Sequence, residues 1–226
     1  MGKGSFISPE QRSGIRARVE PIALAMSRAG LTPNMLTLIG FGIAALGGVL
    51  AAVELWVLAG IVATVGAGFD MFDGAVARAT GQVSKLGAFM DSTFDRWGEG
   101  IVYLGIVIGA TRAGFDLGAW LATAALVSAF MVSYTRAKSE SLGFSSGTGM
   151  AAIGFAPREV RTVILGIAVV MAGIFGVTPE LFDSGSLVLA IGLGLIVVLA
   201  TVTVIQRIRF VTSQPPNPDS DRHTDT

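Results

Sequence analysis

The chain has 226 residues, of which 52% are hydrophobic and only 14% are charged, whereas a typical soluble domain carries about 25% charged residues. The formal net charge is zero, so no overall positive field favours a nucleic-acid partner. The chain contains no cysteine and a single histidine, His223 in a polar tail, which excludes disulfides, thiolate metal sites and a histidine-based triad inside the apolar part. We therefore predict an all-α, polytopic membrane protein.

The N-terminal leader, residues 1–32, is polar and basic. It has no early apolar segment of the kind that marks a cleavable signal peptide. Apolar side chains recur at helical spacing between residues 15 and 26, with arginines among them. This pattern predicts an interfacial amphipathic helix over residues 9–29, lying at the membrane surface. Gly30 breaks that helix, and Pro33 suits the first turn of the next one.

Six apolar segments follow, over residues 33–53, 56–79, 85–111, 117–142, 158–177 and 185–209. Each reaches the roughly 20 residues that a helix needs to cross a bilayer. They predict a transmembrane domain of six helices over residues 33–211, followed by a disordered polar tail over residues 212–226. Most basic residues flank one set of segment ends, which by the positive-inside rule places both termini on the cytoplasmic side of the cell membrane.

Four aspartates, Asp70, Asp73, Asp91 and Asp95, lie at the basic ends of the second and third segments. A carboxylate near lipid costs about 2.5–3.5 kcal/mol even on the lenient insertion scale, so these four need a compensating partner. Each pair is spaced to share one helix face. A turn near residues 80–82 would bring the two faces together into an all-oxygen cage that suits a hard divalent cation such as Mg²⁺.

The full pattern also contains fixed glycine, alanine and arginine positions. It reads Asp70-x2-Asp73-Gly74-x2-Ala77-Arg78-x8-Gly87-x3-Asp91-x3-Asp95. This pattern resembles the signature of the CDP-alcohol phosphotransferase family at every fixed position, and the resemblance covers about residues 9–210. It implies an enzyme that transfers the phosphatidyl group of CDP-diacylglycerol to an alcohol and releases CMP. It also implies Mg²⁺ or Mn²⁺, with two ions, and a homodimer.

The resemblance assigns a role to each matching position. Asp70, Asp73 and Asp91 are metal ligands, and Asp95 joins the metal site and acts as general base. The residues that line the CDP-lipid site are Asn34, Asp73, Gly74, Ala77, Arg78, Ser84 and Gly87. The residue types suit these roles, because glycine permits close approach of a nucleotide and arginine can donate to a phosphate.

A second charged group, which is basic, occupies the ends of the last three segments on the same side. Its members are Arg136, Lys138, Arg158, Arg161 and Arg207. Five cations at one depth predict an acceptor that already bears a phosphate. The alternative is ordinary positive-inside anchoring, which for Arg207 is the better interpretation on sequence alone.

The same segments resemble bacterial phosphatidylinositol-phosphate synthases, a branch of the family whose acceptor is inositol 1-phosphate. By this resemblance the five basic residues surround the acceptor phosphate. The chain departs from the branch in two places. Arg136 precedes Lys138 where the branch has lysine first, and Pro157 replaces a glutamate.

Several alternatives remain open at this stage. Within the family, a phosphatidylglycerol-phosphate synthase would use glycerol 3-phosphate, and an archaeal-type lipid could replace the donor. Outside the family, a cation transporter would use the aspartates as a relay, but they lie near one face and no pair of broken helices is evident. A structural membrane anchor would leave the aspartates unexplained, and simple salt bridging would leave the glycines unexplained.

Overall fold

The computed structural model describes residues 21–144, 154 and 156–214, without the side chain of Asp70. The start of the predicted leader and most of the disordered tail lie outside the described residues. The described part is helical, as predicted. Its helices are α2 (Pro33–Ala52), α3 (Trp56–Gly68), α4 (Asp70–Ala79), α5 (Lys85–Arg112), α6 (Asp116–Ser141), α7 (Arg158–Phe175) and α8 (Ser184–Thr212).

Residues 21–28 are the described part of the predicted amphipathic helix, and they are helical. Ala23 is fully buried against Leu36 of α2 and Val76 of α4, and Met26 packs beside it. The end of the leader is therefore held against α2 and against α4, which carries the first two aspartates. The predicted beginning of this helix, from residue 9, lies outside the described residues.

Two side-chain caps define where the helices around the aspartates begin. The Thr32 hydroxyl accepts a hydrogen bond from the Met35 backbone N–H, with Pro33 in the first turn of α2. The Ser84 hydroxyl accepts a hydrogen bond from the Gly87 backbone N–H at the start of α5. Each cap satisfies a backbone donor that the helix itself leaves unpaired.

The helix predicted over residues 56–79 is divided into α3 and α4 at Phe69. Phe69 keeps helical dihedral angles, with φ −64° and ψ −25°, so the chain continues through the junction without a loop. Gly66 and Gly68 precede this junction, and glycine has a low helix propensity. The division makes Asp70 the first residue of its own short helix.

Four helical stretches are long and apolar enough to cross a membrane, namely α2, the stretch Trp56–Ala79, α6 and α8. The two other predicted spans, α5 and α7, contain too many charged residues to count among these apolar stretches. Helix α7 has Arg158, Glu159 and Arg161 among its first four residues, and α5 carries the third and fourth aspartates. The chain is a membrane protein by its four apolar stretches. Among the charged residues of α5 and α7, Asp91, Asp95, Arg158 and Arg161 belong to the candidate site.

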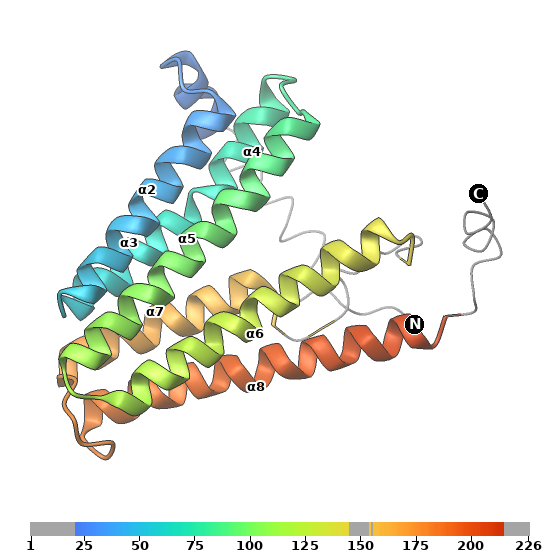
Figure 1. Cartoon of the computed structure of the whole chain (residues 1–226). Helices are drawn as coiled ribbons and strands as arrows, with labels where there is room; N and C mark the ends of the chain where they lie inside the picture. The colour runs from blue at the N-terminus through green and yellow to red at the C-terminus, as the bar shows by residue number, and fades with distance from the viewer. Residues whose placement is uncertain (1–20, 145–153, 155, 215–226) are drawn as a thin grey trace.

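The helices form two groups that are joined at one end and spread apart toward the other (Figure 1). One group contains α2, α3, α4 and α5, and the other contains α6, α7 and α8. Helix α7 packs against both α3 and α8, and α5 packs against α6, so these contacts connect the groups. Helices α2 and α5 approach closely at Gly105, because glycine has no side chain there. A Cβ at this position would overlap the Gly48 carbonyl.

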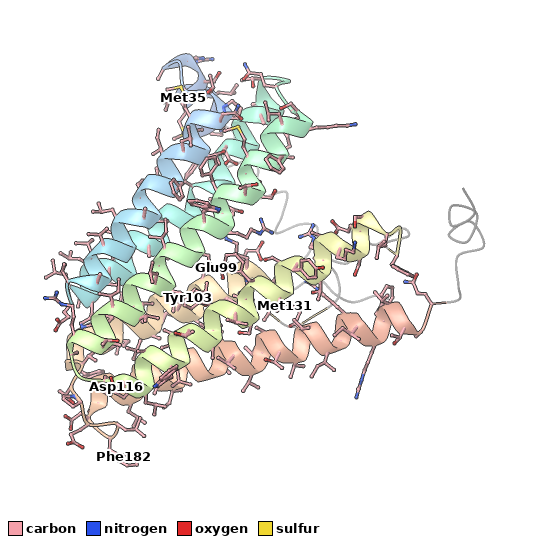
Figure 2. The ribbon with its side chains drawn as sticks, in the orientation of Figure 1. Met35, Glu99, Tyr103, Asp116, Met131 and Phe182 are labelled. Carbon is pink, nitrogen blue, oxygen red and sulfur yellow. The ribbon has the colours of Figure 1, made fainter. Side chains whose placement is uncertain are left out.

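The α2–α3, α5–α6 and α7–α8 connections gather at the joined end, where Figure 2 labels Asp116 and Phe182. Arg112 at the end of α5 forms an ion pair of 3.2 Å with Glu54 of the α2–α3 connection. Gly114 lies against Pro179 of the α7–α8 connection. Met35, in the first turn of α2, lies at the opposite end of the molecule, where the two groups of helices spread apart (Figure 2).

Candidate functional site

A cavity of about 570 Å³ lies between the starts of α2 and α5 and the short helix α4. Its lining includes every residue predicted to contact the CDP-lipid. These are Asn34, Asp73, Gly74, Ala77, Arg78, Ser84 and Gly87. Asp91 lies on the same wall. The turn after α4 and the packing of α2 against α4 and α5 thus bring together residues that are up to 57 positions apart in the chain, from 34 to 91.

Two glycines of the motif lie where polar side chains converge. A Cβ at Gly74 would lie 3.1 Å from Nη1 of Arg78, so this guanidinium extends over the glycine. A Cβ at Gly87 would lie 3.1 Å from the Ser84 hydroxyl and 3.6 Å from Oδ1 of Asn34. The absence of side chains at these two positions keeps the polar wall of the cavity open to a ligand.

Asp73 is the most buried of the described motif aspartates, with 5% of its surface exposed. The Thr37 hydroxyl of α2 lies 2.7 Å from Oδ2 of Asp73 and donates to it. The same hydroxyl lies 3.2 Å from the Pro33 carbonyl. A hydrogen bond from a neighbouring helix fixes the rotamer of the carboxylate and so orients its remaining lone pairs toward the cavity.

The donor set at this cavity is chemically suited to a hard divalent cation, because carboxylate oxygens of Asp73 and Asp91 line the same space. The side chain of Asp70 is not among those that the structure describes. Among the described side chains, no three histidine, cysteine, aspartate or glutamate residues lie close enough together to hold a metal ion. The predicted cage of four carboxylates therefore stays a prediction. Asp73 and Asp91 border the space that it requires.

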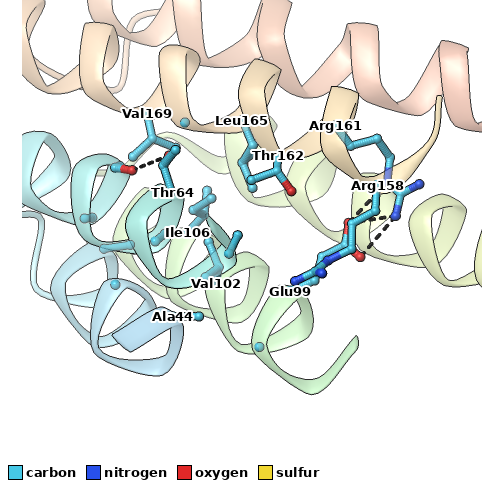
Figure 3. A pocket seen from close by; sticks show the side chains of 18 residues that line it. Ala44, Thr64, Glu99, Val102, Ile106, Arg158, Arg161, Thr162, Leu165 and Val169 are labelled. Atoms are coloured by element: carbon cyan, nitrogen blue, oxygen red, sulfur yellow. Dashed lines mark hydrogen bonds and ion pairs between the residues drawn. The ribbon is translucent and has the colours of Figure 1, made fainter. Parts of the chain in front are cut away.

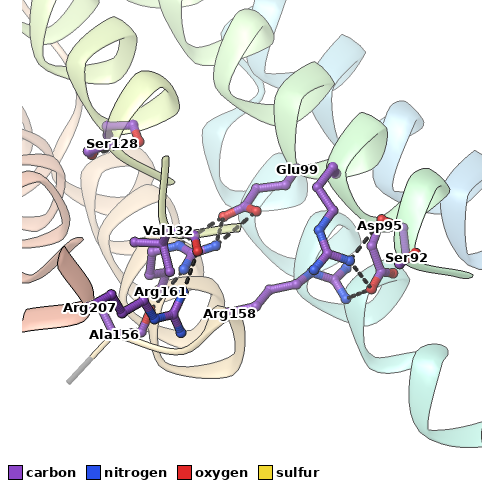
Figure 4. Close-up of polar contacts among 11 residues, drawn as sticks. Ser92, Asp95, Glu99, Ser128, Val132, Ala156, Arg158, Arg161 and Arg207 are labelled. Atoms are coloured by element: carbon purple, nitrogen blue, oxygen red, sulfur yellow. Dashed lines mark hydrogen bonds and ion pairs between the residues drawn. The ribbon is translucent and has the colours of Figure 1, made fainter. Parts of the chain in front are cut away.

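Asp95 does not line this cavity but points toward α7, where it meets Arg158 (Figure 4). Nη1 of Arg158 lies 2.6 Å from Oδ2 of Asp95, and the two side chains are 20% and 12% exposed. Nη1 of Arg96 lies 3.7 Å from the same oxygen. The structure therefore brings the acidic helix α5 and the basic start of α7 into direct contact.

Arg161, one turn further along α7, is buried and pairs with Glu99 of α5. Nε and Nη2 of Arg161 donate to both carboxylate oxygens of Glu99 at 3.0–3.1 Å. Nη1 donates to the Ala156 carbonyl at 2.9 Å. All three guanidinium nitrogens are engaged in these bonds.

The other predicted acceptor residues lie in different surroundings. Arg207 is buried and Nη1 of its guanidinium donates to the Val132 carbonyl of α6, so it is an interior residue rather than a surface anchor. Arg136 is exposed and pairs with Glu140 on its own helix at 3.0 Å, and Lys138 is exposed. The contacts bring Arg158 and Arg161 to the aspartate helix, whereas those of Arg136 remain within α6.

Figure 3 shows a smaller cavity between α2, α3, α5 and α7. Its volume is about 40 Å³. Small and apolar side chains such as Ala44, Val102 and Leu165 line most of it. The polar groups Glu99, Arg158 and Arg161 stand at one end. The cavity is large enough for at least one water molecule beside this charged end.

Sequence analysis missed two residues that contact the site, Thr37 and Glu99. Glu99 follows Asp95 by four residues, and Asp91 by eight, so the three carboxylates form one row along α5. A further carboxylate in an apolar helix was the available signal. Thr37 gave no such signal, because a threonine in an apolar helix commonly bonds to its own backbone.

Comparison with known proteins places the chain among related enzymes. The family model described as CDP-alcohol phosphatidyltransferase matches residues 30–206. The chain is 37% identical over 198 residues to the archaetidylinositol phosphate synthase of Pyrococcus horikoshii, covering 87% of this chain and 92% of that protein. It is 32% identical over 216 residues to the phosphatidylinositol phosphate synthase of Mycobacteroides abscessus, covering 90% of each.

Solved structures of Mycobacterium tuberculosis phosphatidylinositol phosphate synthase share the fold. The crystal structure with CDP-DAG bound has a TM-score of 0.74 at 28% identity, and covers 87% of this chain and 94% of that one. The crystal structure of the same enzyme with manganese and citrate has a TM-score of 0.72 at 27% identity, and covers 87% of this chain and 90% of that one. The motif, the cavity that it lines and the match over most of the chain lead to one conclusion: the protein belongs to the CDP-alcohol phosphatidyltransferase family and is an enzyme of that class.

Proposed function

We propose that the protein transfers the phosphatidyl group of CDP-diacylglycerol to the hydroxyl of a phosphorylated polyol, with inositol 1-phosphate as the favoured acceptor, and releases CMP. The contact between Asp95 and Arg158 is the observation that carries this proposal, because it joins an acidic half and a basic half at one place. Relatives named as inositol phosphate synthases of both the phosphatidyl and the archaetidyl kind support an acceptor with this chemistry.

In the proposed reaction the acceptor hydroxyl attacks the phosphorus of the phosphatidyl group. A new phosphorus–oxygen bond forms, the bond to the bridging oxygen of the pyrophosphate breaks, and CMP leaves with that oxygen. Asp95 accepts the proton of the attacking hydroxyl as general base. Arg158, beside Asp95, binds the phosphate of the acceptor and so places the hydroxyl next to the base.

The donor binds on the other side, in the cavity that the motif lines. Arg78 donates to a donor phosphate, and the bare faces of Gly74 and Gly87 admit the nucleotide. Asp70, Asp73, Asp91 and Asp95 are the residues that would hold Mg²⁺ or Mn²⁺, and we propose two ions. When bound, such ions neutralise charge on the pyrophosphate oxygens and on the leaving group.

An acceptor panel tests the proposal. Purified protein in nanodiscs would receive labelled CDP-diacylglycerol, Mg²⁺ or Mn²⁺, and either inositol 1-phosphate, glycerol 3-phosphate or unphosphorylated inositol. CMP release with inositol 1-phosphate alone supports the proposal. CMP release with glycerol 3-phosphate alone would identify the protein as a phosphatidylglycerol-phosphate synthase instead. CMP release with unphosphorylated inositol would show that the reaction does not require a phosphate on the acceptor.

The donor lipid is a second variable, because the relatives include archaetidylinositol phosphate synthases. A parallel series with an archaeal-type ether lipid linked to CDP would measure kcat/KM for each donor with the same acceptor. A higher value for the diacyl donor supports our assignment. A preference for the ether lipid would change the donor and leave the acceptor unaffected.

Thr37→Val should raise the metal concentration needed for half-maximal activity by about 10- to 100-fold. The substitution keeps the shape of the side chain but removes the hydrogen bond to Asp73, and losing an outer-shell partner of a metal ligand typically has an effect of this size. Titration of activity with Mn²⁺ measures it. Thr123→Val is the matched control, because that hydroxyl bonds only to the Ala119 carbonyl on its own helix. Equal titrations would show that Thr37 does not orient a metal ligand.

Arg158→Ala should raise the KM for the acceptor by about 10- to 100-fold, because a hydrogen bond to a charged group contributes about 1.5–3 kcal/mol. Binding of CDP-diacylglycerol should stay within about twofold of the parent value, since Arg158 does not line the donor cavity. Steady-state kinetics and donor binding by calorimetry measure the two effects. Arg112→Ala, at the far end of α5, is the control. An unchanged acceptor KM would remove Arg158 from the acceptor site.

Topology and assembly complete the proposal. We propose six membrane crossings in the cell inner membrane, with both termini and the active site on the cytoplasmic side and the leader lying along that surface. We also propose a homodimer. Two variants with single cysteines, Ser213→Cys and Asp183→Cys, test the topology in intact cells. Only the cysteine at position 183 should react with a membrane-impermeant thiol reagent, and labelling at position 213 instead would contradict the proposed orientation. The mass of the protein in nanodiscs tests the dimer.

A further inference from the structure

We infer that Glu99 is a positioning residue that, through Arg161, holds the first turn of α7 and thereby fixes Arg158 opposite Asp95. This inference rests on the proposed function, because it assigns Glu99 to the acceptor half of the same site. Glu99 lies outside the aspartate motif, and the sequence patterns assign it no role in binding the donor or the acceptor. Figure 4 shows it between the two halves, on α5 and facing Arg161.

The first step in the argument is the geometry of the Glu99–Arg161 pair. Both side chains are buried, at 7% and 1% exposure, and both carboxylate oxygens accept from the guanidinium. A bidentate pair fixes the relative orientation of the two groups as well as their distance. In the interior, neither charge can be left without its partner except at a large cost. The pair therefore joins α5 and α7 in one defined arrangement.

The second step is what Arg161 holds besides Glu99. Its Nη1 donates to the Ala156 carbonyl, two residues before α7 begins. The Ala156 backbone N–H in turn donates to the Thr203 hydroxyl of α8 at 3.1 Å. One buried network thus runs from α5 through Arg161 to the entry of α7 and on to α8. It determines where the first turn of α7 stands relative to the aspartate helix.

The third step connects this network to the acceptor site. Arg158 is the first residue of α7, three positions before Arg161, and the two lie in adjacent positions on one face. Asp95 is four positions before Glu99 on α5. The pairs Asp95–Arg158 and Glu99–Arg161 are therefore two ion pairs between the same two helices, α5 and α7. The Glu99–Arg161 pair is the more buried one, and the Asp95–Arg158 pair is the one that the acceptor would contact.

The fourth step explains why Arg161 needs Glu99 to stay in place. The cavity of about 40 Å³ in Figure 3 borders Arg161, Glu99 and Thr162. Without the carboxylate, the guanidinium has this space and the polar Thr162 beside it as an alternative location. A shift of about 1 Å at the start of α7 would be enough to misplace an acceptor hydroxyl, with a loss on the order of 100-fold in rate.

Glu99→Gln tests the inference by separating the two substrates. We expect kcat/KM for inositol 1-phosphate to fall on the order of 100-fold, with donor affinity within about twofold of the parent protein. Glu54→Gln is the matched control, because it removes the same charge from a solvent-exposed pair with Arg112 at the opposite end. Unchanged acceptor kinetics in Glu99→Gln would overturn the inference.

A double variant, Glu99→Gln with Arg161→Gln, distinguishes positioning from stability alone, also where the single variant folds poorly. Removing both charges avoids an unpaired buried ion, so the melting temperature should return toward that of the parent protein. Positioning predicts that the acceptor defect remains. Recovery of acceptor kinetics together with stability would show that the pair has only a structural role.

Direct binding keeps the inference independent of turnover. Calorimetric titration with inositol 1-phosphate and with inorganic phosphate should show weaker binding in Glu99→Gln than in Glu54→Gln. If the parent protein releases no CMP with any acceptor but binds phosphate in a Glu99-dependent manner, the proposed function fails and the positioning role stands. If the parent turns over and the two variants bind phosphate equally, the positioning role fails and the function stands.

Discussion

Asp95→Asn should retain the fold and the affinity for CDP-diacylglycerol but lose turnover by about 10²- to 10⁴-fold, the usual contribution of a general base. Asparagine has nearly the same shape and still accepts a hydrogen bond from Arg158, which lies 2.6 Å from the carboxylate. It cannot take the proton of the attacking hydroxyl. Single-turnover release of labelled CMP measures the chemical step, and calorimetry measures donor binding.

The control for this variant is Asp116→Asn, the same change at the exposed start of α6 at the joined end of the molecule. Its turnover should equal that of the parent protein. If Asp95→Asn keeps near-normal turnover, Asp95 is not the base. If it loses donor binding in proportion to turnover, its main role is in the donor and metal site.

Asp91→Asn should have the largest effect on metal binding. Loss of an outer-shell partner typically costs about 10- to 100-fold in metal affinity, and we expect more than about 100-fold for loss of a ligand. In the parent protein, chelation should abolish CMP release, and added Mg²⁺ or Mn²⁺ should restore it. Binding of Mn²⁺ followed by electron paramagnetic resonance measures affinity without relying on activity. Asp183→Asn, in the connection before α8, is the matched control.

Two results would contradict this assignment. Full activity after exhaustive chelation would remove the metal from the reaction. Equal Mn²⁺ affinity in Asp91→Asn and Asp183→Asn would remove Asp91 from the metal site. The shared cavity wall of Asp73 and Asp91 is the reason to expect neither result.

Linear spacing was sufficient to predict which residues line the larger cavity. The seven residues predicted to contact the CDP-lipid line one cavity. Six of them belong to two helices joined by a short turn, and Asn34 lies at the start of α2, which packs against both. Local geometry of this kind follows from helical periodicity and from the caps at Thr32 and Ser84. The division at Phe69 was missed, since hydropathy averages over a helix and does not register a single junction.

The surroundings of the basic residues assigned to the acceptor depend on contacts between distant segments. Periodicity placed Arg158 and Arg161 at the start of one helix, but it did not indicate that each would meet a different carboxylate of α5. Arg207 looked like a surface anchor by its position at a helix end, and the structure buries it against α6. Burial of a terminal arginine depends on which helices flank it, which the order of residues along one helix does not specify.

By itself, the sequence determined the helical membrane class, the starts of α2, α3, α5 and α7, and the aspartate motif, because these depend on composition and on neighbours within a few positions. Only the tertiary structure decided that Thr37 bonds to Asp73 and that Glu99 pairs with Arg161. These partners are 36 and 62 residues apart in the chain. Such pairings arise from helix packing, where close approach at small residues selects which polar groups meet in the interior.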